Sequence, residues 1–209
     1  MRSRRLDYSE STRSALVSSA VELFTKRGYA GTSLDEVAKR ARVTKGALYH
    51  HFSGKQALFE AAFEAVESLV FDRLEKIMNG PETPWERALS GVRAFIKSCL
   101  DPAYQRIAIH EAPVVMGWER WREAEDRCSF GLIRASLEAL IASGDVDDVP
   151  VEITARLLFG ALSSAATEIA SSADPKKVGA QIEGVIVQLL ERVRLPVAVE
   201  QPVVPEQAR

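Results

Sequence analysis

Apolar residues recur at helical spacing along most of the chain, and no segment alternates apolar and polar residues as a half-buried strand would. A first apolar stripe runs from Leu16 to Phe24, and Gly28 predicts the end of that helix, which we expect to begin near Ser9 or Ser11. Similar stripes follow almost to the C-terminus. The pattern therefore predicts an all-α fold of about nine helices.

Residues 33–52 (SLDEVAKRARVTKGALYHHF) predict two short helices joined by a three-residue turn. Apolar residues at positions i, i+3, i+4 and i+7 from Leu34 mark one face of the first helix. The period then breaks at residues 41–43. Thr44 is placed to cap a second helix over Lys45–His51.

The second helix has one polar side. At about 100° per residue, its outer arc holds Lys45, Gly46, Tyr49 and His50, and Leu48 lies on the opposite arc. A helix of this width fits the major groove of DNA, and in a helix-turn-helix the second helix reads that groove. Any two-helix corner can show this pattern, so the pattern alone also permits a purely structural role.

The residues that follow favour DNA binding. Ser53 and Gln56 have the spacing of a capping box, which predicts a new helix start beside the second helix. The free N–H groups and positive dipole end of such a helix suit a phosphate, and Lys55 adds a positive charge there.

Charge is spread unevenly along the chain. Residues 1–55 carry 11 Lys and Arg against 5 Asp and Glu, whereas the whole chain has a net charge of −2. The basic N-terminal part suits an approach to DNA. We expect residues 1–8 to lack regular structure, and their arginines predict either an arm that touches DNA or a solubilising tail.

These residues also resemble a known family. Gly28-Tyr29-Ala30-Gly31-Thr32-Ser33, Val37-Ala38, the run from Val43 to Phe52 and Lys55 resemble the DNA-binding domain of TetR-family transcriptional regulators, closely over about residues 10–70. The resemblance implies a homodimeric, ligand-responsive repressor that binds a palindromic operator in double-stranded DNA. It implies an N-terminal three-helix helix-turn-helix domain and a C-terminal helical domain for ligand binding and dimerisation.

The resemblance also implies particular contacts. By position it assigns DNA contacts to Thr44, Lys45, Gly46, Tyr49, His50 and Lys55, and phosphate contacts to Thr32 and Ser33. The turn of such domains usually holds Gly where this chain has Arg42. If Arg42 is left-handed, its side chain costs about 1–2 kcal/mol, which a contact between Arg42 and a phosphate would offset.

The sequence predicts four regions. Residues 1–8 form the basic arm, residues 9–55 the DNA-binding domain, residues 56–195 the effector-binding and dimerisation domain, and residues 196–209 a disordered tail with three prolines. A fourth helix from Ser53 to Met78, about 39 Å long at 1.5 Å per residue, would belong to both domains. The later helices are expected over residues 84–100, 102–111, 117–143, 150–173 and 175–194, with Ala112-Pro113 as a break.

The last two helices predict a dimer interface. The helix over 150–173 is apolar over most of its surface, so it must be covered on every side. A second copy can supply that cover, as the family resemblance also implies, although a purely intramolecular core is the alternative. The predicted interface residues are Leu158, Leu162, Ala165, Ile169, Ile182, Val185, Ile186 and Leu189.

Aromatic and polar side chains in the middle helices predict a pocket for a small, largely apolar effector. The same residue types also build ordinary cores, and His110 is either a ligand contact or a satisfied helix residue. The candidate pocket residues are Phe63, Phe95, His110, Glu111, Met116, Trp118, Trp121, Phe130 and Phe159.

Other classes of protein have weaker support. No apolar run approaches the roughly 20 residues of a membrane span, so we expect a cytoplasmic protein that acts at the nucleoid. No nucleophile–base set and no cysteine pair with metal-ligand spacing are present, which predicts neither an enzyme nor a cofactor nor a metal. Cys99 and Cys128 are expected to be reduced core residues. Three alternatives stay open: a metal-sensing regulator of the same fold that uses His110, Glu111 and Cys128, an activating regulator of that fold, and a helical interaction module without DNA binding.

Overall fold

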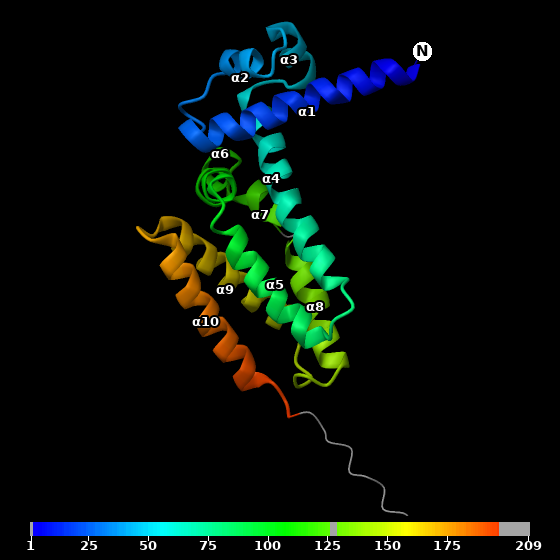
Figure 1. Cartoon of the computed structure of the whole chain (residues 1–209), viewed down its shortest axis with the longest axis vertical. Helices are drawn as coiled ribbons and strands as arrows, with labels where there is room; N and C mark the ends of the chain where they lie inside the picture. The colour runs from blue at the N-terminus through cyan, green and yellow to red at the C-terminus, as the bar shows by residue number, and fades with distance from the viewer. Residues whose placement is uncertain (1, 126–128, 197–209) are drawn as a thin grey trace, which may run out of the picture.

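The computed structural model describes residues 2–125 and 129–196, and every regular element in these two ranges is helical (Figure 1). This confirms the predicted all-α fold. No helix among the described residues has both the length and the apolar composition needed to cross a membrane. In chain order the elements are α1 (Arg2–Arg27), α2 (Leu34–Arg40), α3 (Lys45–His51), α4 (Lys55–Met78), α5 (Pro84–Ser98), the π-helix η1 (Tyr104–Glu111), α6 (Ala112–Val115), α7 (Trp118–Glu125), α8 (Gly131–Ala142), α9 (Val151–Ser171) and α10 (Pro175–Val193).

Helices α1, α2 and α3 and the first turns of α4 form a small unit that we call the head. Figure 1 shows α1 lying across the top of the molecule, with α2 and α3 on its outer side and α4 leading away from them. The head is held together by fully buried apolar side chains, among them Leu16, Phe24, Val37, Leu48 and Phe59.

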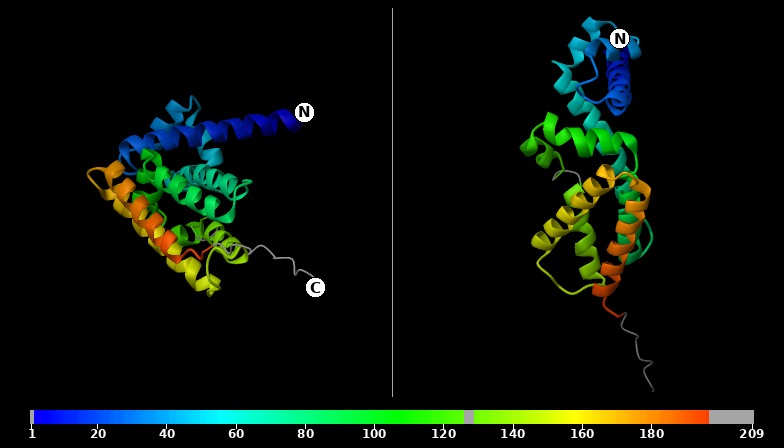
Figure 2. Two further views of the ribbon diagram at one scale, coloured as in Figure 1. Left: turned by 60° about the horizontal axis from the view of Figure 1, so that its bottom comes forward. Right: turned by 90° about the vertical axis from the view of Figure 1, so that its left-hand side faces the viewer.

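Helix α1 begins earlier than its apolar stripe indicated. The prediction that residues 1–8 lack regular structure is wrong for residues 2–8, which continue α1 back to Arg2; Met1 lies outside the described residues. Residues 2–8 contain neither Gly nor Pro, so nothing in them ends the helix. In Figures 1 and 2 this end of α1 projects beyond the rest of the head.

The two motif helices have the predicted boundaries, and their caps explain why. Ser33 begins α2 with a capping box that sequence analysis did not identify: its Oγ accepts from the Glu36 N–H, and the Glu36 carboxylate accepts from the Ser33 N–H. Thr44 caps α3 as predicted. Between them Arg42 has a φ of 58°, so the turn residue is left-handed without being glycine.

Helix α4 starts one residue later than its predicted cap would place it. Its N-cap is Gly54, which forms no side-chain capping bond, so the predicted capping box of Ser53 and Gln56 is wrong. Because the helix begins at Lys55, Gln56 is its second residue and donates to Glu60 instead. The helix ends at Met78, as predicted.

The remaining helices form the body, which Figure 2 shows as a layered bundle below the head. The predicted break at Ala112-Pro113 does not interrupt the helical course of the chain, because α6 begins at Ala112, directly after η1. Pro113 lies in the first turn of α6, where a missing N–H costs nothing. The helix predicted over 117–143 is described as α7 and α8, on either side of residues 126–128, which lie outside the description.

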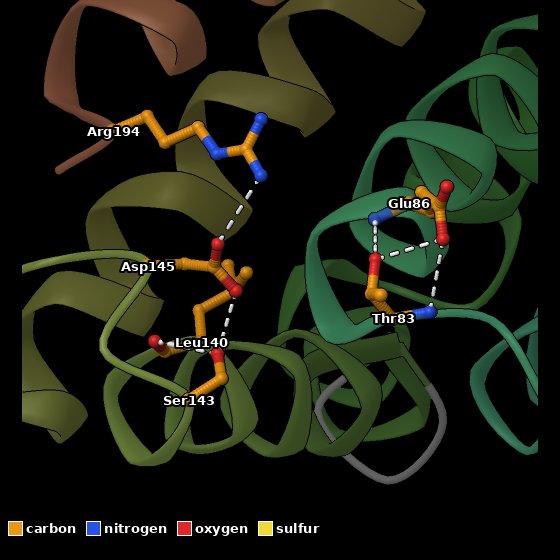
Figure 3. A network of polar contacts seen from close by, with 6 residues as sticks. All are labelled: Thr83, Glu86, Leu140, Ser143, Asp145 and Arg194. Atoms are coloured by element: carbon orange, nitrogen blue, oxygen red, sulfur yellow. Dashed lines mark hydrogen bonds and ion pairs between the residues drawn. The ribbon is translucent and has the colours of Figure 1, made fainter. Parts of the chain in front are cut away.

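The end of the body away from the head is fastened by polar contacts (Figure 3). Asp145, in the loop after α8, accepts from the Ser143 hydroxyl at 2.6 Å and from Arg194 at 3.5 Å. These bonds tie that loop to the end of α10. Beside them the Thr83–Glu86 capping box starts α5, and its hydrogen bonds lower the pKa of the Glu86 carboxyl.

The predictions for the two cysteines and for the C-terminal tail concern residues that lie only in part within the described ranges. Cys99 is buried, as expected of a core residue, whereas Cys128 lies outside the described residues. The predicted tail over 196–209 also lies outside them from residue 197 onward.

Candidate DNA-binding surface, cavity and dimer face

The outer face of α3 presents the side chains that the helical period placed there. Thr44 Oγ1 accepts from the Ala47 N–H at 3.1 Å and fixes the start of the helix. Leu48 is fully buried, whereas half of the Tyr49 side-chain surface is exposed. With the helix in this orientation, four residues on its outer face are exposed: Lys45, Gly46, Tyr49 and His50.

Lys45 is paired with a carboxylate that sequence analysis did not include. Its Nζ lies 2.8 Å from Oδ1 of Asp35, in the first turn of α2, and both side chains are well exposed. The hydrogen bond to Asp35 raises the pKa of the Lys45 ammonium. A base or phosphate must therefore compete with Asp35 for this ammonium.

The candidates for phosphate contact are placed differently from one another. Thr32 is buried and its hydroxyl donates to the Gly28 carbonyl at 2.9 Å, so the assignment of a phosphate contact to that hydroxyl is wrong. The Gly28 carbonyl, directly after α1, takes the place of water as the partner of the Thr32 hydroxyl. Ser33 and Arg42 are both exposed, although the Ser33 hydroxyl also caps α2.

Lys55 lies at the start of α4 and is held by two neighbours from the α1–α2 loop. Its Nζ is 4.4 Å from the centroid of the Tyr29 ring and 3.4 Å from the Ala30 carbonyl oxygen, to which it donates. The side chain is half-buried. The ammonium is thus positioned by the protein before any DNA arrives.

Other basic residues of the head are paired across its helices. Arg27 at the end of α1 pairs with Glu36 of α2, and Arg40 of α2 pairs with Glu22 of α1. Hydrogen bonds from Ser33 and then from Arg27 lower the pKa of the Glu36 carboxyl. These exposed pairs link α2 to α1 across the surface of the head, above the buried core that packs the two helices together.

The body contains a cavity of about 720 Å³ that is partly open to the surface. Its wall draws on every helix from α4 to α10, including η1 and α6. Among the described residues of the wall, none is Asp, Glu, Lys, Arg or His, and the polar groups there are those of serines, Thr167 and Tyr104 and the indole N–H groups of Trp118 and Trp121. Such a wall suits an uncharged molecule, because an unpaired charge is costly to bury.

The structure brings four of the nine candidate pocket residues to this wall: Phe95, Trp118, Trp121 and Phe159. The other five lie elsewhere, so their prediction as wall residues is wrong. Phe63 and Met116 pack in the core that head and body share, and Phe130 packs in a second cluster with Phe159. His110 bonds the Ala170 carbonyl at 3.1 Å, and Glu111 faces α1.

Helices α9 and α10 leave a stripe of apolar side chains exposed, which we call the dimer face. Of the predicted interface residues, Leu158, Val185 and Leu189 are exposed, while Leu162, Ile182 and Ile186 are half-buried. Ala165 and Ile169 are buried within the chain, so placing them at an interface is wrong. Three further exposed apolar residues of these two helices extend the stripe: Ile153, Leu157 and Val193.

The dimer face and the cavity share residues. Leu158, Leu189 and Val193 are exposed on the outside and also line the cavity. The proposed metal set gains no support from the part of the chain that is described, where no group of three or more His, Cys, Asp or Glu side chains is placed to hold a metal ion.

Family models cover both parts of the molecule. Residues 16–62 match the model described as bacterial regulatory proteins, tetR family. Residues 85–193, which are more than half of the chain, match the model described as tetracyclin repressor-like, C-terminal domain.

Individual proteins agree with these models. The crystal structure of a TetR-family transcriptional regulator from Pectobacterium atrosepticum is 31% identical, with a TM-score of 0.79 over 91% of this chain and 97% of that chain. The transposon Tn10 TetC protein of Escherichia coli is 28% identical over 72% of this chain and 76% of its own length. The negative transcriptional regulator IcaR of Staphylococcus aureus is 35% identical over 30% of this chain and 32% of its own length.

Proposed function

Because the chain belongs to the TetR family of bacterial regulatory proteins, it is a DNA-binding transcriptional regulator, and we propose that it is a homodimeric repressor released from its operator by an uncharged apolar effector. The observation that carries this proposal is the exposed face of α3 beside the ammonium of Lys55. A negative regulator among the relatives supports the direction of control.

In the proposed complex, α3 enters the major groove. Lys45 and His50 face base edges, where an ammonium can donate to guanine O6 and N7. Tyr49, Ser33 and Lys55 contact phosphates and fix the register without reading sequence. Arg42 reaches the backbone from the turn, where its side chain is exposed.

The proposed dimer forms through the dimer face. Leu157 is 71% exposed, and Ile153 and Leu189 are each 63% exposed, so one copy leaves large apolar side chains in water along two adjacent helices. A second copy related by a two-fold axis would cover them with the same surface. Two copies of α3 then face half-sites about 34–36 Å apart, or a multiple of that distance.

The proposed effector occupies the cavity. Its wall is apolar and lacks formal charges among the described residues, which favours an uncharged, hydrophobic molecule over an anion or a cation. An effector that binds better to a body conformation with the wrong spacing of the two α3 helices shifts the population away from DNA.

Selection from a pool of random duplexes tests the DNA-binding mode. We expect the purified protein to enrich a palindrome whose half-sites have the spacing given above. Enrichment of a single unrepeated half-site would contradict the dimer, and no enrichment at low salt would contradict sequence-specific binding. The affinity of the selected site should also fall steeply with salt, since bound phosphates release counterions.

Two related dyes test the effector class. N-phenylnaphthylamine and anilinonaphthalene sulfonate share the same rings, but only the second carries a charge. We expect the neutral dye to bind at least about tenfold more tightly, because the sulfonate would be buried without a partner. Equal or reversed affinities would contradict an uncharged effector.

The family is one of transcriptional regulators and not of enzymes, and we assign no catalytic role to any residue. We further propose that the protein acts in the cytoplasm, where its operator lies.

A further inference from the structure

Head and body are joined by a carboxylate as well as by α4. Glu111, the last residue of η1, accepts a hydrogen bond from the Tyr29 N–H at 2.9 Å through Oε2. Its Oε1 accepts from Arg106 Nε at 3.1 Å, and only 18% of its side chain is exposed. The bond joins segments 82 residues apart in sequence.

Gly28 permits this approach. It follows the end of α1 with a φ of 74°, which side chains disfavour. A Cβ on Gly28 would lie 2.5 Å from Glu111 Oε1 and would also collide with the guanidinium of Arg106. The backbone is therefore bare at the point where the Glu111–Arg106 pair meets the head.

The N–H that Glu111 binds belongs to Tyr29, whose ring also contacts the Lys55 ammonium. The Tyr29 ring packs edge-on against Phe59, with centroids 5.3 Å apart, and tilted against Phe24 at 5.9 Å. The Lys55 ammonium lies 4.4 Å from the centroid of the same Tyr29 ring and donates to the next carbonyl, that of Ala30. Backbone and ring of Tyr29 thus connect Glu111 to Lys55.

We propose that Glu111 is a positioning residue for DNA binding: it contacts no DNA, and by holding the Tyr29 N–H it keeps Lys55 in the place from which it reaches a phosphate. This inference rests on the proposed DNA-binding mode. Because η1 also contributes Tyr104, Ala108 and Ile109 to the cavity wall, the same segment connects that wall to the phosphate contact.

The test measures binding of the full-length protein to a random-sequence duplex over a series of salt concentrations. Lys55→Ala should weaken binding on the order of tenfold at low salt and reduce the salt slope by about 2, since a dimer loses two phosphate contacts. Glu111→Ala should change both quantities in the same direction. The double variant Lys55→Ala/Glu111→Ala should bind no more weakly than Lys55→Ala alone, because Glu111 acts through Lys55.

Two variants isolate the hydrogen bond. Glu111→Gln removes the same charge as Glu111→Ala but keeps an oxygen for the Tyr29 N–H, so it should retain the wild-type salt slope. Glu111→Asp keeps the charge but withdraws the carboxylate by one methylene, so it should resemble Glu111→Ala and replaces it if the alanine variant does not fold. Arg120→Gln is a control that breaks an exposed ion pair between α7 and Glu60 of α4, and it should leave the slope unchanged.

The outcomes separate this inference from the proposed function. A wild-type protein that binds no duplex at low salt overturns both. Wild-type binding that depends on Lys55 but not on Glu111 overturns the positioning role alone. Additive losses in the double variant also overturn it, because they would mean that Glu111 acts independently of Lys55.

Discussion

The head and the body treat their apolar side chains in opposite ways. In the head, Val37 and Leu48 are fully buried, and the exposed side of α3 is polar. In the body, Leu157 and Leu189 are mostly exposed, and a cavity of about 720 Å³ lies beneath the same helices. The head is complete as a single copy, whereas the body still has surface to cover and space to fill.

This contrast matches the division of labour in the proposed function. A surface that reads DNA needs side chains held in fixed positions, so the head surrounds them with a closed core and paired charges. A surface that assembles and a cavity that responds need apolar groups left available to a partner or an effector. Four experiments test this contrast, taken from the largest expected effect to the smallest.

The first prediction concerns the dimer face. Leu157→Glu combined with Val185→Glu places two charges on exposed positions of α9 and α10, so each copy should still fold but no longer pair. Losing the second half-site should weaken binding to a palindromic operator by about 10²–10⁴-fold. Analytical ultracentrifugation and operator titration measure the two effects.

The control for this experiment is another exposed leucine. Leu69 is 69% exposed and belongs to α4, which is not one of the two helices that form the dimer face. Leu69→Glu should therefore leave both dimerisation and operator affinity unchanged. If it disrupts the dimer as strongly as the double variant does, the interface lies elsewhere.

The second prediction compares one leucine from each region. Leu48→Ala empties a fully buried position in the head and should lower the free energy of unfolding by about 2–5 kcal/mol. Leu189→Ala removes a side chain that is 63% exposed in a single copy, so it should cost much less folding stability and should instead weaken the dimer.

Urea unfolding at one fixed protein concentration measures both leucine variants, because the stability of a dimer depends on concentration. Equal destabilisation by the two substitutions would show that the body folds only as a dimer. The contrast between a complete head and an incomplete body would then extend to folding itself.

The third prediction concerns sequence reading by α3. Lys45→Ala should change the preferred base at one position of each half-site, with a loss of discrimination on the order of tenfold if Lys45 reads a guanine. Asp35→Asn should have the opposite tendency and strengthen binding several-fold, since it frees the ammonium from its 2.8 Å ion pair. Repeating the duplex selection with each variant measures both changes. An unchanged preferred site for Lys45→Ala would mean that α3 lies differently in the groove.

The sequence predicted the head better than the body for a physical reason. The caps at Thr44 and the inward side of Leu48 depend on residues a few positions apart, so local spacing determines them. The boundaries that were wrong there, the start of α1 and the cap of α4, lie where no strong stop or cap decides them, and the contact assigned to Thr32 was wrong because its hydroxyl is buried against Gly28.

In the body, the wrong predictions concern contacts between distant segments. The period of a helix indicates that Phe63, Met116 and Phe130 point inward, but it does not indicate which neighbour they meet, and all three meet core instead of cavity. Likewise Ala165 and Ile169 share a stripe with exposed Leu158, yet they pack within the chain. Glu111 was predicted as a pocket residue, but it bonds Tyr29, which is 82 positions away in the sequence.

The smallest effect is expected at Arg42, whose backbone in the turn between α2 and α3 is strained. With a φ of 58°, Arg42 is in a conformation that costs a residue with a side chain about 1–2 kcal/mol. Glycine avoids this steric cost, but it loses more conformational entropy on folding, which offsets part of the gain. Arg42→Gly should therefore raise the free energy of unfolding by about 0.5–1 kcal/mol and yet weaken DNA binding, because the exposed guanidinium is lost. Arg42→Ala should weaken DNA binding equally without the gain in stability. If Arg42→Gly stabilises the protein and leaves DNA affinity intact, the turn is strained for no gain in binding, and Arg42 must be removed from the proposed contacts.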